Sequence, residues 1–118
     1  VAADLYVSAA GYNSFHEAIY NRVPTIFIPQ MAVYMDDQHA RATAAFERGL
    51  AVLVEPHEIM SLDAIVQRML DGEAQAMRDK LAVQELPEPG CAAAAALITE
   101  LAEPQSGRIK SVMNRRIA

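Results

Sequence analysis

The segment Gly11-Tyr12-Asn13-Ser14-Phe15-His16-Glu17 carries side chains suited to binding a nucleotide. It lies where a predicted buried strand ends and a predicted helix begins, and ligands of open parallel sheets bind at the carboxyl ends of strands. The first turn of a helix offers unpaired N–H groups and a partial positive charge, which favour a phosphate. Gly11 lets the backbone approach a ligand closely, and Asn13 and Ser14 add side-chain donors. One turn into the helix, Glu17 could accept hydrogen bonds from two neighbouring hydroxyls, as on a ribose.

The same segment has a purely structural interpretation. Ser14 and Glu17 have the spacing of a capping box, in which the serine side chain bonds the Glu17 N–H and the glutamate reaches back. Glu17 would then stabilise the helix locally by roughly 1 kcal/mol. Spacing alone does not separate the two interpretations.

A second polar group, Asp37 and Gln38, follows the next predicted strand and opens the next predicted helix. In a parallel sheet these residues would face the same ligand edge as Gly11. The structural alternative is that they are ordinary helix N-terminal residues, with Asp36 as the cap.

Short apolar runs over residues 5–8, 25–28 and 51–54 predict the strands that position these groups. Helical spacing predicts a helix from Ser14 to the Val23-Pro24 pair, and others over 36–48, 61–70, 73–83 and 91–102. Gly49 would stop the second of these helices. Buried strands alternating with helices predict an α/β fold, a partial Rossmann-like parallel sheet with flanking helices. Three strands followed by a helical end correspond to the second half of a doubly wound domain.

Composition excludes several classes of protein. The chain has 118 residues, enough for one domain or less, and 53% of them are hydrophobic, which suits a packed core. The net charge of −5 argues against nucleic acid as a partner, because a duplex binder needs a basic face. Cys91 is the single cysteine, so an intrachain disulfide is impossible, and we expect a cytoplasmic protein. The three histidines form no pair at metal-binding spacing, so we predict no metal.

An ordered set of residues resembles the donor-binding signature of GT-B glycosyltransferases. The set comprises residues 10–18, Val23-Pro24, Ile28-Pro29, Asp37-Gln38, Ala42 and Gly49. It is similar to the signature of UDP-dependent glycosyltransferases and to that of the N-acetylglucosaminyltransferases that build the peptidoglycan lipid intermediate. The resemblance implies the C-terminal half of a GT-B C-terminal domain, which would bind a nucleotide-diphosphate sugar, a UDP-sugar, for hexosyl transfer to an acceptor.

The resemblance also implies roles for individual residues. Gly11, Asn13 and Ser14 would bind the donor diphosphate, and Glu17 would bind the ribose. Asp37 and Gln38 would bind the transferred sugar. We assign no catalytic base, cofactor or metal ligand, because the acceptor pocket and any base of such enzymes usually belong to an N-terminal domain.

Three positions depart from the family pattern. Ala9 replaces a histidine of the plant-type members. Arg41 replaces a frequent asparagine; it could contact a phosphate, but we expect an exposed helix arginine. Arg22 replaces a glycine at the helix end, where Asn21 could supply the left-handed residue instead.

We expect residues 1–103 to form the partial donor-binding domain and residues 104–118 a polar, basic tail. Because the chain lacks an initiator Met, we expect it to be part of a longer enzyme that includes the acceptor domain. Association with a membrane through a lipid acceptor is compatible with the basic tail. Two alternatives stay open: a nucleotide-sugar epimerase or hydrolase of the same fold, and a non-catalytic donor-binding subunit of a split transferase.

Overall fold

A computed structural model describes residues 2–32 and 36–102, and its sheet is parallel throughout. The strands are β1 (Tyr6–Ser8), β2 (Thr25–Phe27) and β3 (Val52–Leu53), in the order β1-β2-β3. Val7 lies opposite Ile26, and Phe27 lies opposite Leu53. The three predicted strands are confirmed, although each is one or two residues shorter than its apolar run. Apolar residues on β2 form the centre of the core because this strand has a neighbour on both sides.

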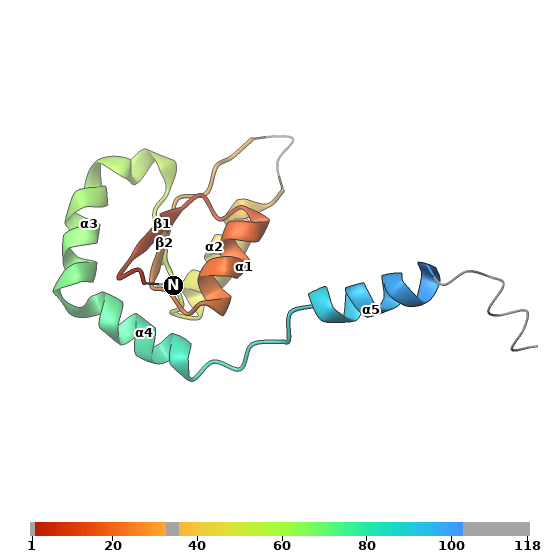
Figure 1. Cartoon of the computed structure of the whole chain (residues 1–118). Coiled ribbons are helices and arrows are strands. Elements are labelled where there is room, and N and C mark those ends of the chain that lie inside the picture. The colour runs from red at the N-terminus through yellow and green to blue at the C-terminus, as the bar shows by residue number, and fades with distance from the viewer. Residues whose placement is uncertain (1, 33–35, 103–118) are drawn as a thin grey trace, which may run out of the picture. The chain divides into compact units, whose positions relative to one another are not determined.

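Helices cover both faces of the sheet, so the predicted α/β fold with flanking helices is confirmed (Figure 1). Ile26 and Phe27 are fully buried and belong to different core clusters, because successive side chains of a strand point to opposite faces. The Phe27 cluster is mostly alanine from α1 (Tyr12–Tyr20) and α2 (Gln38–Glu47), which allows close packing of these helices on the sheet. The Ile26 cluster adds larger side chains: Ile19, Leu50, Val54, Met69, Met77 and Leu81.

The start of α1 differs from the prediction. The helix begins at Tyr12 rather than Ser14, and Gly11 is its N-cap residue. Ala10 has a left-handed backbone (φ 63°), and the Gly11 carbonyl accepts the first helical hydrogen bond, from the Phe15 N–H at 2.8 Å. Ser14 therefore lies inside the first turn and does not cap the helix, so the capping-box interpretation is wrong.

The end of α1 has a Schellman motif. The Val23 N–H donates to the Ala18 carbonyl and the Arg22 N–H to the Ile19 carbonyl, both at 3.0 Å. The left-handed residue is Arg22 (φ 57°), whereas Asn21 is right-handed, so the expectation for Asn21 is wrong. Arg22 tolerates this backbone because its guanidinium donates to carbonyls at the end of α4, as described below.

The cap of α2 also differs from the prediction. Asp37, not Asp36, is the N-cap residue, and its side chain accepts a hydrogen bond from the Ala40 N–H at 2.9 Å. The stop at Gly49 is confirmed, since this glycine has φ 69° and follows the helix end in a second Schellman motif.

The remaining elements are helical. They are η1 (Pro56–Ser61), α3 (Leu62–Arg68), η2 (Met69–Glu73), α4 (Ala74–Ala82) and α5 (Cys91–Ala102). The backbone kinks at Gly72 in η2 (φ 151°), which separates α3 from α4 as predicted. Contacts divide the chain into two units, Val1–Leu86 and Pro87–Ala118, and α5 belongs to the second. The predicted tail lies outside the described residues, and no described helix is both long and apolar enough to cross a membrane.

Candidate functional site

The two polar turns predicted from sequence lie side by side at the carboxyl edge of the sheet. One turn joins β1 to α1 and contains Gly11; the other leads into α2, contains Asp37 and ends at Gln38, the first residue of that helix. Because β1 and β2 are adjacent parallel strands, both turns leave the same edge. A β-carbon at Gly11 would lie 4.0 Å from Nε2 of Gln38, so the turns are close enough to contact one ligand.

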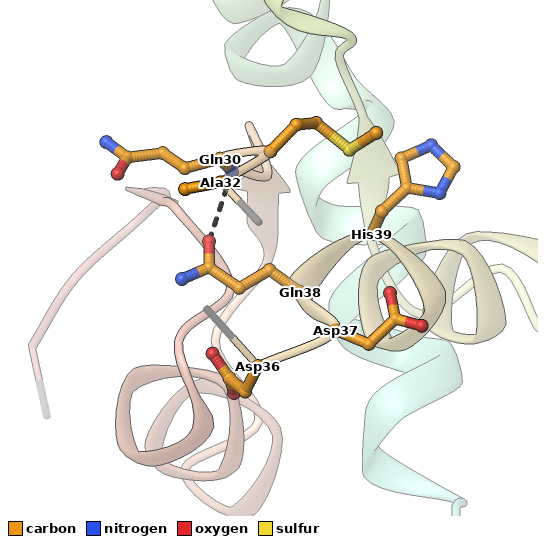
Figure 2. Close-up of a pocket in the computed structure, with 7 residues that line it drawn as sticks. Gln30, Ala32, Asp36, Asp37, Gln38 and His39 are labelled. Atoms are coloured by element: carbon orange, nitrogen blue, oxygen red, sulfur yellow. Dashed lines mark hydrogen bonds between the residues drawn. The ribbon is translucent and has the colours of Figure 1, made fainter. Parts of the chain in front are cut away.

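A hollow of about 420 Å³ opens beside the start of α2 (Figure 2). Its lining residues come from the segments after β2 and at the start of α2: Gln30, Met31, Ala32, Asp36, Asp37, Gln38 and His39. Most of the polar lining groups are carboxylates and amides, which bind hydroxyl groups well. The hollow therefore suits a small hydroxylated ligand such as a sugar.

Asp37 and Gln38 each form a hydrogen bond that stabilises the local backbone. Oδ1 of Asp37 accepts the capping bond from Ala40, and the carboxylate retains further acceptor capacity toward the hollow. Gln38 is 4% exposed, and its Oε1 accepts a hydrogen bond from the Gln30 N–H at 3.1 Å (Figure 2). This bond holds the end of the β2 segment against the start of α2. Both residues thus stabilise the wall to which they belong.

Gly11, Asn13 and Ser14 occupy the N-cap and first turn of α1. Backbone N–H groups in the first turn have no carbonyl partner within their own helix. Asn13 is exposed and Ser14 half-buried, but none of the three residues lines the hollow beside α2. The N–H groups and side chains of this turn lie on the surface that adjoins the hollow, and their binding of an anion stays a prediction.

Glu17 lies apart from the hollow beside α2. It is the sixth residue of α1, it is exposed, and it lines a smaller hollow of about 110 Å³. The other lining residues of this second hollow are Ala3, Tyr6, Ala18, Asn21 and Val23, none of which lines the first. Ala3 and Val23 lie just before β1 and β2, so this second hollow opens at the amino edge of the sheet, away from the two turns.

Arg41 is not the exposed helix arginine expected from sequence. Its side chain is only 19% exposed. One guanidinium nitrogen donates to the Ala10 carbonyl at 2.7 Å, and the other pairs with the Asp36 carboxylate at 2.7 Å. Arg41 thus connects the turn before α1 to the turn before α2. Sequence reasoning missed these contacts because Ala10 and Arg41 are 31 positions apart.

A histidine–carboxylate pair lies on the other side of the same hollow. Nε2 of His39 is 2.7 Å from Oε1 of Glu55, which follows β3, and Nδ1 is 3.5 Å from the Thr43 hydroxyl. The pair connects α2 to the segment that follows β3, and it fixes the position of the His39 imidazole at the side of the hollow. Within residues 2–32 and 36–102 the side chains of His, Cys, Asp and Glu form no group of three arranged to hold a metal ion.

Comparison with known proteins gives one family match. Residues 1–92 match the family model described as "Glycosyltransferase family 28 C-terminal domain". Neither the curated proteins nor the solved structures include a significant match to this chain. The matched region includes both turns and both hollows, and ends just after α5 begins.

Proposed function

The chain belongs to the glycosyltransferase family 28 C-terminal domain family, a GT-B domain that binds the sugar donor, and from this premise we propose that its ligand is a UDP-sugar. The nucleotide would bind along α1 and the sugar beside the start of α2. The hexosyl group would then be transferred to an acceptor on the separate acceptor-binding domain that membership of this family implies.

The proximity of the two turns is the observation that carries this proposal. An extended ligand with its ribose at Glu17 and its diphosphate at Gly11, Asn13 and Ser14 would direct its sugar toward Asp37 and Gln38. The hollow beside the start of α2, lined by Asp37 and Gln38, supports the placement of the sugar. The N–H groups at the start of α1 would stabilise negative charge on the departing diphosphate, and no group of this chain is assigned as the base.

We further propose that the enzyme resembles the lipid-intermediate N-acetylglucosaminyltransferases more than the plant-type transferases. Ala9 stands two residues before Gly11, where the plant-type members have a histidine. Residues 1–103 would form this chain's share of the donor domain, with the basic segment 104–118 as its tail. A lipid-linked acceptor would place the enzyme in the cytoplasm at the membrane surface.

Calorimetric titration of the full-length protein tests the donor assignment. We expect UDP and a UDP-sugar to bind, and ADP- and GDP-sugars to bind more weakly. UDP release that requires an added acceptor would support transfer. Release of free sugar without an acceptor would indicate a hydrolase, and conversion of the sugar to its epimer would indicate an epimerase. A protein that binds no nucleoside diphosphate contradicts the proposal.

A further inference from the structure

Arg41 is placed to control the conformation of the turn before α1. One guanidinium nitrogen donates to the Ala10 carbonyl, and the other is held by the Asp36 carboxylate, each at 2.7 Å. The guanidinium carbon also lies 5.5 Å from the centre of the Tyr12 ring and 5.9 Å from that of Phe15. Two hydrogen bonds and two ring faces give this side chain one defined position between α1 and α2.

The conformation that Arg41 holds is an unfavourable one. Ala10 is fully buried and has φ 63°, a left-handed backbone that is disfavoured for a residue with a β-carbon. The Ala10 carbonyl and the Gly11 N–H belong to one planar peptide group, so fixing the carbonyl also fixes the direction of that N–H. The first turn of α1 follows directly, and its entry direction depends on the same peptide group.

The link to Asp36 extends this control to the second turn. Asp36 lies immediately before the N-cap residue Asp37 and lines the hollow beside α2. Its ion pair with Arg41 ties that segment to the same guanidinium that holds Ala10. One side chain therefore sets the spacing between the turn assigned to the diphosphate and the turn assigned to the sugar.

We propose that Arg41 is a positioning residue that holds the Ala10 turn in its left-handed conformation and fixes both donor-binding turns before the ligand arrives. This inference rests on the proposed function of this edge as a nucleotide-sugar site. It assigns Arg41 an action through the backbone of Ala10, and it does not require contact between the guanidinium and the ligand.

The test combines Arg41→Ala with Ala10→Gly in the full-length protein, with UDP and UDP-sugar affinities measured by calorimetry. We expect Arg41→Ala to weaken both ligands by about tenfold or more, because a charge-assisted hydrogen bond to the turn is lost. Ala10→Gly alone is the reference against which the double variant is compared. Because glycine adopts the left-handed backbone without penalty, Ala10→Gly should recover a large part of the loss in the double variant. Equal losses in Arg41→Ala and in the double variant would mean that Arg41 contacts the ligand directly, which overturns the inference.

Two further variants test the same inference independently of Arg41→Ala. Arg41→Lys keeps the charge, but a lysine cannot bond Ala10 and Asp36 at the same time as the arginine fork does. We expect an intermediate loss of ligand affinity, and adding Ala10→Gly should reduce that loss. This pair of variants gives a test even if Arg41→Ala fails to fold. Wild-type affinity in Arg41→Lys would show that a point charge suffices and would overturn the inference. Arg48→Ala is the matched control, because Arg48 follows α2 and bonds Gln84 away from the turns; its affinity should be unchanged. A wild-type protein that binds no nucleoside diphosphate would instead reject the proposed function.

Discussion

At the scale of single residues, the proposed sugar-binding side chains also maintain the backbone around them. Asp37 caps α2, and the buried Gln38 accepts a hydrogen bond from the Gln30 N–H. Removing Gln38 would remove this hydrogen bond, at a cost of about 0.5–1.5 kcal/mol. Alanine substitutions here therefore change stability as well as binding, and isosteric substitutions give clearer tests.

Asp37→Asn is the variant that separates these effects. Asparagine is a good N-cap residue, so we expect the melting temperature to stay close to that of the wild type. The loss of the carboxylate should weaken the UDP-sugar by about 1–2 kcal/mol and leave free UDP almost unchanged. Calorimetry with both ligands measures the difference. Asp37→Ala serves as the comparison, since it should also lose about 1 kcal/mol of stability through the missing cap. If Asp37→Asn weakens the binding of UDP and of UDP-sugar equally, Asp37 does not contact the sugar.

Glu17→Gln tests the ribose contact. Glu17 lies in the middle of α1 and its side chain takes no part in a cap, so the free energy of unfolding should change by no more than about 0.5 kcal/mol. We expect UDP binding to weaken by about 1–3 kcal/mol, because hydrogen bonds from hydroxyls to a charged carboxylate are lost. In 2′-deoxy-UDP the effect of the substitution should be much smaller, since one of those hydroxyls is missing. An equal effect on UDP and its deoxy form would place Glu17 elsewhere on the ligand.

At the scale of elements, two helices of this fold end in the same way with different residues. α1 ends with Arg22 and α2 with Gly49, both left-handed at the same position of a Schellman motif. Glycine adopts this backbone freely, whereas arginine does not. The Arg22 guanidinium offsets that cost by donating to the carbonyls of Leu81 and Ala82, at the negative end of α4. The end of α1 is thus coupled to the end of α4.

Arg22→Gly should be destabilising although it installs the residue most common at this position. The substitution removes a backbone strain of about 1–2 kcal/mol, but it also removes charge-assisted hydrogen bonds of about 1.5–3 kcal/mol each. We expect a net loss of about 1–5 kcal/mol in urea unfolding, and Gly49→Ala should lose about 1–2 kcal/mol because it adds strain without any compensating bond. An Arg22→Gly protein at least as stable as the wild type would show that the contact with α4 contributes little.

At the scale of the whole molecule, the site on this chain can bind a donor but holds no assigned catalytic base. Family membership implies that the acceptor binds to a separate domain. Donor binding and sugar transfer should therefore be separable activities. Under the proposed function, this chain would position the leaving group, whereas activation of the acceptor would depend on the other domain.

Residues 1–118 alone should therefore transfer no sugar. Purified as a separate chain and given UDP-sugars with lipid-linked or small-molecule acceptors, they should release no UDP above background. The full-length protein under the same conditions is the positive control, and circular dichroism of the separate chain checks that it is folded. Clear turnover by residues 1–118 would mean that the acceptor site and the base lie within this chain.

The sequence by itself determined the order and type of the elements, because apolar runs, helical spacing and turn residues are local signals. The alternation of strands and helices, the stop at Gly49 and the break between α3 and α4 are all confirmed. Adjacency of the first two strands also follows from this alternation, and with it the placement of Gly11 and Gln38 at one edge.

Only the tertiary structure decided how the helix ends are built and which charges pair. α1 starts at Tyr12 because the turn at Ala10 is held by Arg41, which is far away in sequence. The Asp36 carboxylate likewise pairs with Arg41, and Asp37 takes the cap of α2 instead. Arg22 can be left-handed because α4 ends beside it. At Ala10 and at Arg22 a local preference is overridden by a hydrogen bond to a distant part of the chain, and such bonds exist only after folding has brought those parts together.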